Sequence, residues 1–173
     1  MRRAAAGFAG GLLGALAMDA FARLVRSVNH GREADGAAPG LDRAGRGVQP
    51  PQAAGSTDQD ATILAGTAVY RSITGDEPDR RTRHWLGSAI HYAFGGAVGL
   101  CYALVRDAAP LIRAAHGTAY GTLVWAVADE GVMPALALSR GPRHLPTGVH
   151  AFALIGHWVY GVTLEEVVRR TDV

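Results

Sequence analysis

The chain has 173 residues, a formal net charge of +2, and 49% hydrophobic residues. This length suits a single domain. So small a net charge, without an arginine-rich run that carries interleaved aromatic residues, argues against a nucleic-acid-binding protein. Charged residues are concentrated between positions 23 and 83 and at the chain ends. The long apolar stretches that remain predict an integral membrane protein.

The first apolar stretch covers residues 4–25 and predicts a transmembrane helix. It follows two arginines, and its small residues also fit a secretory signal with cleavage near residues 15–17. A stripe of small residues four apart continues to Asp19, past that cleavage point. This continuity favours a retained helix, whereas cleavage would leave three spans.

The segment between the first and second spans is polar. Residues 30–56 are rich in Gly, Pro and Ala and have no hydrophobic period, which predicts a flexible loop. Residues 58–74 carry apolar side chains at largely helical spacing. They predict a short amphipathic helix on the membrane surface or against the bundle.

The second predicted span, residues 86–105, carries no formal charge. About 20 helical residues cross a hydrocarbon core of roughly 30 Å. Three arginines and Trp85 come just before the run, at the expected level of the lipid headgroups. We expect Pro78 in the first turn of this helix, with Asp76 or Glu77 near its cap.

Two further spans are predicted at residues 117–138 and 147–167, and both contain ionisable side chains. The predicted fold is therefore an all-α integral membrane four-helix bundle, with one flexible polar loop and one short amphipathic helix. A single membrane domain covers residues 1–173.

Small residues spaced four apart recur along three of the four spans. Such spacing lets helix backbones approach closely inside a bilayer, where hydrophobicity alone drives little association. The pattern predicts tight packing at Gly7, Gly11, Gly95, Gly99, Gly117 and Gly121.

The ionisable residues of the spans follow these stripes and predict a polar seam inside the bundle. Charged groups in a membrane helix usually face the bundle interior because exposure to lipid is costly. Asp129 and Glu130 are adjacent, and Pro134 predicts a kink or helix end just after them. Their role is either proton or cation handling or a structural clasp across helices. The predicted polar seam comprises Asp19, His91, Asp129, Glu130, His150 and His157.

Simpler roles are open for several of these groups. Asp19 precedes Arg23 by one turn, so an ion pair near the helix end explains both. His91 fits a packed, neutral histidine equally well. Glu165 and Glu166 each precede an arginine by four residues, which predicts ion pairs at a solvated helix end.

Motifs of metal and hydrolytic sites are missing. The chain contains no Glu-x-x-His, no His-Glu-x-x-His and no Gly-x-Ser-x-Gly, and Cys101 is its single cysteine. We therefore expect no metal site, no cofactor and no enzymatic activity.

Three patterns in the second half resemble a known family. They are "HYAFGGAVGLCY" at 91–102, "W...DE...P.L.LS..P...P" at 125–146 and "H......H.VYG...E" at 150–165. The sequence resembles the YagU-type bacterial inner-membrane proteins, a family defined mainly as a domain of unknown function, over roughly residues 80–170. The resemblance implies a polytopic protein of a bacterial inner membrane and no established catalytic residues.

These observations favour an uncharacterised multi-pass inner-membrane protein that handles protons or small cations in the polar seam. The alternative is a non-catalytic accessory or assembly subunit of a larger membrane complex, and a third hypothesis is metal or haem binding. Expected partners are membrane lipid and either further copies of the chain or a larger membrane complex, with no nucleic acid.

Overall fold

The computed structural model describes residues 1–34, 61–139 and 145–171, and the described residues are helical with no strand. The helices are α1 (Arg2–Ala34), α2 (Ala61–Thr74), α3 (Arg80–Val105), α4 (Thr118–Val127), α5 (Met133–Ala135) and α6 (Thr147–Thr171). A 3₁₀ turn, η2 (Pro110–Arg113), precedes α4, and a π-helical turn, η3 (Ala128–Val132), joins α4 to α5. The predicted all-α class is confirmed for this part of the chain.

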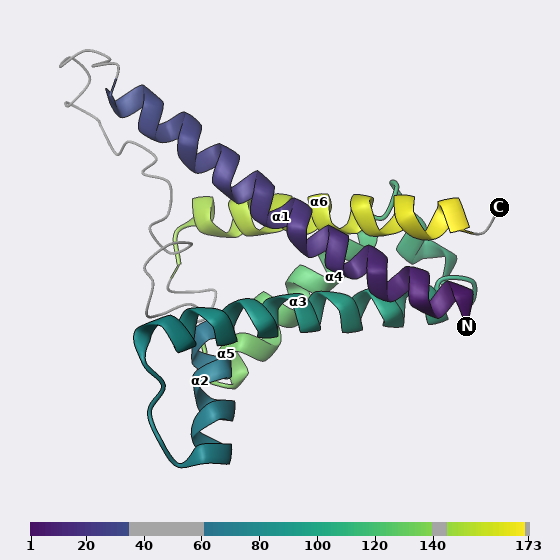
Figure 1. Ribbon diagram of the computed structural model, residues 1–173. Helices are drawn as coiled ribbons and strands as arrows, with labels where there is room; N and C mark the ends of the chain where they lie inside the picture. The colour runs from purple at the N-terminus through teal and green to yellow at the C-terminus, as the bar shows by residue number, and fades with distance from the viewer. Residues whose placement is uncertain (35–60, 140–144, 172–173) are drawn as a thin grey trace.

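The long helices pack side by side, with α1 lying across both α3 and α6 (Figure 1). α3 and α6 run in roughly the same direction, and α1 runs against them, so the two chain ends lie at the same end of the molecule. α2 packs on α3 at a steep angle, and α4 packs on α6. The end of the molecule that holds both chain ends is called the terminal end below.

Glycines make the helix contacts close. A methyl group added at Gly11 would lie 2.9 Å from the carbonyl carbon of Gly95 and 3.0 Å from the Cα of Gly99. Gly7 also abuts Gly99, so the small residues of α1 and α3 face each other. Gly10 and Gly14 of the same helix face α6, where Tyr160 and Leu164 fill the space. α1 can therefore approach two helices at once.

The α4–α6 contact uses the same device. Gly117 is the N-cap of α4 and has a φ of +84°. Its backbone abuts the Gly161 backbone. Gly121 abuts the His157 backbone one turn later. Tyr102, Leu164 and Val168 are fully buried at the centre of the adjoining core.

Two of the described helices, over Arg2–Val28 and Arg80–Val105, are long and apolar enough to cross a membrane by length and composition. These correspond to the predicted spans 4–25 and 86–105. The remaining two predicted spans do not meet that test within the described residues. A membrane bundle of four spanning helices is therefore not established.

Several predicted boundaries are wrong. α1 continues to Ala34, so the start of the predicted loop 30–56 is helical, and the rest of that loop lies outside the described residues. α2 begins at Ala61 in the described part of the predicted helix 58–74. α6 extends to Thr171, beyond the predicted end at 167.

α3 begins earlier than predicted, and its cap is neither Asp76 nor Glu77. Asp79 is the N-cap, because its carboxylate accepts a hydrogen bond from the Thr82 amide at 2.7 Å. Pro78 lies before the cap and outside the first turn. The charged turn 80–85 is helical because this cap satisfies one of its free backbone amides.

The predicted span 117–138 is not one continuous α-helix. α4 ends at Val127, and the chain then widens into the π-helical turn η3 before α5. The amide of Met133 reaches back five residues to the carbonyl of Ala128. Pro134 has no backbone N–H to donate, which weakens the α-helical pattern at this point and accounts for the break that the sequence predicted.

Candidate functional site

Asp129 and Glu130 lie on the π-helical turn η3. Such turns insert an extra residue into a helix and occur frequently at functional sites. Each acid meets a different histidine of α6. Glu130 Oε1 lies 2.5 Å from His150 Nδ1, and Asp129 Oδ2 lies 3.8 Å from His157 Nδ1. His150 and His157 are seven residues apart, so they lie on the same face of α6. Each of them faces one of the two adjacent acids, which no single histidine could pair with at once.

His157 has its proton position fixed by α6 itself. Its Nδ1 lies 2.9 Å from the Ala153 carbonyl oxygen, which can only accept a hydrogen bond. Nδ1 therefore carries a proton and donates it to that carbonyl. The Asp129 carboxylate lies beyond hydrogen-bond distance from the same atom and acts on the imidazole through its charge.

A third acid–imidazole pair connects α1 with α3. Asp19 accepts a hydrogen bond of 2.6 Å from the Tyr92 hydroxyl, and its other oxygen lies 3.6 Å from His91 Nε2. This Nε2 is buried and has no hydrogen-bond partner within the described residues. The simpler hypothesis, which joined Asp19 to Arg23, thus misses the two partners that α3 supplies.

Two cavities that share lining residues border two of these three pairs, Asp19–His91 and Asp129–His157. The smaller, of about 130 Å³, is lined by His91, Asp129, His157, Tyr160 and apolar side chains of α1, α3 and α4. The larger, of about 460 Å³, shares His91 and Asp129 and adds Asp19. A water molecule occupies roughly 30 Å³ in the liquid, so the smaller cavity has room for a few waters. Four of the six predicted seam residues therefore border partly open cavities between the helices.

The predicted seam residues are brought together only as pairs. Asp19, His91, Asp129 and His157 line the cavities, whereas Glu130 and His150 form a neighbouring pair that lines neither. The six glycines predicted for helix packing all lie at the contacts of α1 with α3 or of α4 with α6. In the described ranges, no group of three or more His, Cys, Asp or Glu side chains could hold a metal ion.

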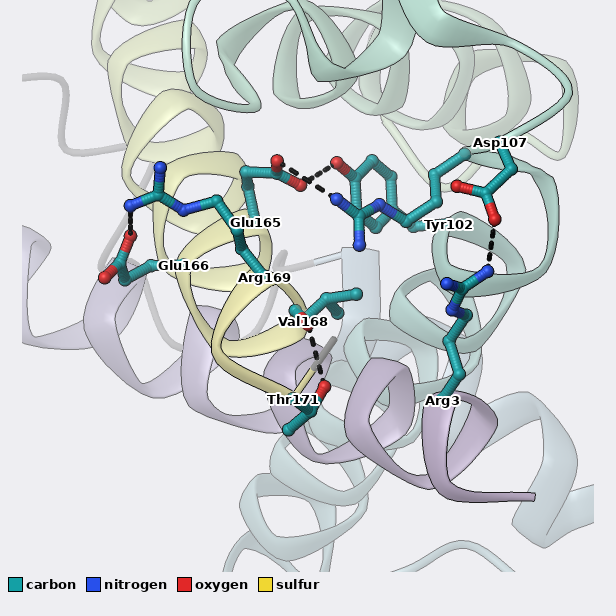
Figure 2. A network of polar contacts seen from close by, with 9 residues as sticks. Arg3, Tyr102, Asp107, Glu165, Glu166, Val168, Arg169 and Thr171 are labelled. Carbon is teal, nitrogen blue, oxygen red and sulfur yellow. Dashed lines mark hydrogen bonds and ion pairs between the residues drawn. The ribbon is translucent and has the colours of Figure 1, made fainter. Parts of the chain in front are cut away.

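Glu165 lies in surroundings that the sequence interpretation missed. It is buried, accepts a hydrogen bond from the Tyr102 hydroxyl, and lies 3.4 Å from Arg106 Nη2 (Figure 2). The predicted solvated ion pair is therefore wrong for Glu165. It holds for Glu166, which contacts both Arg169 and Arg170 on the exposed side of α6.

The helical period offered a signal for this difference. Glu165 continues the stripe His157–Gly161 at the next fourth position, and this stripe faces the interior. The burial of Arg106 was harder to predict. Arg106 follows the uncharged run of α3, and an arginine at that position is also typical of a contact with lipid headgroups.

A family model described as "Protein of unknown function (DUF1440)" matches residues 77–166, more than half of the chain. The chain belongs to the DUF1440 family. The DUF1440 segment begins just before α3 and ends at Glu166, so it contains every predicted seam residue except Asp19. The expectation of a family of unknown function is confirmed, and the likeness to the YagU type stays a prediction. Neither the curated proteins nor the solved structures contain a match.

Proposed function

We propose that this protein is a multi-pass inner-membrane protein of the YagU type that handles protons through the polar seam. One observation carries the proposal: the π-helical turn directs two adjacent acids at two different histidines of α6, beside a partly open cavity between the helices. The two apolar helices α1 and α3 support a place in the membrane. α4 and α6 would complete the crossing as part of the same packed unit.

The chemistry of the pairs suits proton exchange. An imidazole can accept a proton on one ring nitrogen while the other donates, and a carboxylate can take up or release a proton. A proton can move directly within the Glu130–His150 pair, whereas the separations of 3.6 Å at Asp19–His91 and 3.8 Å at Asp129–His157 require a bridging water. No separated charge then has to cross an apolar region, where an isolated ion is very costly. Water in the cavity would carry protons between His91 and Asp129.

A proton fits these residues better than a metal cation. Sodium, magnesium and calcium ions prefer several oxygen ligands around one point. Here each carboxylate is matched with an imidazole, and the described residues offer no cluster of three ligands. The buried indole N–H of Trp125, one turn before Asp129, has no acceptor in the described part of the chain.

The test is proton flux in liposomes. The double variant Asp129→Asn, Glu130→Gln keeps the size and hydrogen-bonding capacity of both side chains but removes their proton sites. We expect at least a tenfold loss of flux, read from a pH-sensitive dye inside vesicles under an imposed potential. Glu166→Gln is the matched control, because Glu166 has the same charge on the exposed side of α6, and it should keep native flux.

Two outcomes would overturn the proposal: no flux from the native protein, or native flux from the folded double variant. Tolerance of the acid substitutions would favour the alternative, an accessory or assembly subunit. That alternative predicts loss of partner co-purification when Gly95 or Gly99 is enlarged, because these glycines set the α1–α3 contact.

A further inference from the structure

A second group of ionisable side chains is buried at the terminal end of the molecule. Tyr102, Arg106 and Glu165 keep 0%, 3% and 7% of their surface exposed. The Tyr102 hydroxyl donates to one carboxylate oxygen of Glu165, and Arg106 lies beside the other (Figure 2). The polar seam already described contains none of these residues.

Burying such a pair is costly. Removing a carboxylate and a guanidinium from water carries a large desolvation penalty, and an apolar pair of the same volume often stabilises a fold equally well. Ionisable groups inside membrane helices are rare for this reason and usually mark ion or proton pathways. Adjacent Glu166 avoids this cost because it pairs on the exposed face.

The cluster lies on the same face of α6 as the seam. The buried residues of α6 form one continuous stripe that includes His157, Tyr160, Gly161 and Glu165. Eight residues of helix separate His157 from Glu165, which corresponds to about 12 Å along the axis. Tyr160 lies between them and also lines the smaller cavity.

The surroundings of Glu165 on its other sides carry few charges. Tyr102 of α3 and the C-cap residue Arg106 contact Glu165. α4 supplies Tyr120, and the centroids of the Tyr120 and Tyr102 rings lie 4.7 Å apart. The backbone of Gly117 packs directly on the Glu165 side chain. The α1 side is apolar, with Gly10 against Leu164 and Val167.

Water is close on the terminal side. Arg3 of α1 forms an exposed ion pair with Asp107, the residue that follows Arg106 (Figure 2). The cluster thus lies between the polar seam and a hydrated surface. Among the described residues, Glu165 is the one carboxylate buried to this degree.

We infer that Glu165 is a second proton-binding site, which continues the polar seam to the terminal end. This inference rests on the proposed function. The carboxylate takes a proton from the seam through water, becomes a neutral acid, and releases the proton to water beside Arg3 and Asp107. Release of the proton restores the carboxylate beside Arg106, and the site can then take up the next proton.

The test compares Glu165→Gln with Glu166→Gln in the same liposome assay. The amide oxygen introduced by Glu165→Gln can still accept the Tyr102 hydrogen bond, so this substitution removes the proton site with little change in shape. We expect Glu165→Gln to lower flux at least tenfold, Glu166→Gln to keep native flux, and Glu165→Asp to retain an intermediate rate because it keeps a carboxyl group. Circular dichroism and size-exclusion chromatography establish that each variant is folded.

The outcomes separate the two proposals. Flux that is lost in the Asp129→Asn, Glu130→Gln variant but kept in folded Glu165→Gln overturns the second site alone. No flux in the native protein overturns both proposals. If Glu165→Gln fails to fold, Glu165→Asp decides the question. Its shortened carboxyl group reaches Tyr102 and Arg106 less well, so the second site predicts a reduced flux, and native flux would contradict it.

Discussion

Substitution of Gly11 by alanine tests how strictly the α1–α3 contact depends on small residues. The new methyl group would lie 2.9 Å from the Gly95 carbonyl carbon and 3.0 Å from the Gly99 Cα. Carbon atoms pack best at about 3.5–4.0 Å, so the two helices must separate by roughly 0.5–1 Å. Both neighbours are backbone atoms, so no side chain can rotate away.

A gap of that size forfeits about a quarter to a half of each dispersion contact around it. Overpacking of this kind costs typically ~1–3 kcal/mol. Alanine also favours the helix over glycine by up to about 1 kcal/mol, which offsets part of the cost. Gly148→Ala is the control, because a methyl group there meets nothing within 4 Å.

The assay is unfolding in mixed micelles with increasing dodecyl sulfate, followed by circular dichroism. We expect Gly11→Ala to be less stable than Gly148→Ala by about 1–3 kcal/mol, the range given for overpacking. Equal stability of the two variants would refute the argument, since it would mean that α1 and α3 are not in close contact in the folded protein.

Two further predictions concern single hydrogen bonds. Tyr160→Phe removes the 2.7 Å bond from the buried hydroxyl to the Gly95 carbonyl. This should cost about 0.5–1.5 kcal/mol in the same assay, the net value of one hydrogen bond, because the carbonyl keeps its helical bond within α3; an unchanged midpoint would contradict this. Asp79→Ala should lower the melting temperature, whereas Asp79→Asn should retain most of it, because asparagine also caps helices. The Thr82 amide lowers the pKa of the exposed Asp79 carboxyl. The ionised carboxylate therefore stabilises the folded protein above the unfolded-state pKa, and this stabilisation is lost as the pH falls through the folded-state pKa. The measurement is the difference in melting temperature between the native protein and Asp79→Ala. An equal difference at neutral and at strongly acid pH would count against this reasoning.

Local patterns were enough to predict the helix contacts and the break. Small residues four apart lie on one face of any helix, so their role in packing follows from the period alone. Pro134 marked the weak point of the predicted third span because proline lacks a backbone donor. The π-helical form of the break was not predicted, since proline predicts where a helix weakens and does not specify the hydrogen-bond pattern there.

The histidine partners of Asp129 and Glu130 could be identified only from the tertiary structure. The sequence placed Asp129, Glu130, His150 and His157 in one region but gave no means of matching them, because the match depends on the depth of α4 relative to α6. Glu165 was misassigned for a related reason. Its spacing to Arg169 equals that of Glu166 to Arg170, and only the buried face of α6 distinguishes the two acids.

The position of α1 across both α3 and α6 has a consequence for biogenesis. Gly14 contacts Tyr160, which is added 146 residues later in the chain. At a synthesis rate of roughly 5–20 residues per second, about 7–30 s pass before that partner exists. For this interval the face of α1 that carries Gly10 and Gly14 lacks its native neighbour. Synthesis of α6 therefore has to precede the completed packing of α1.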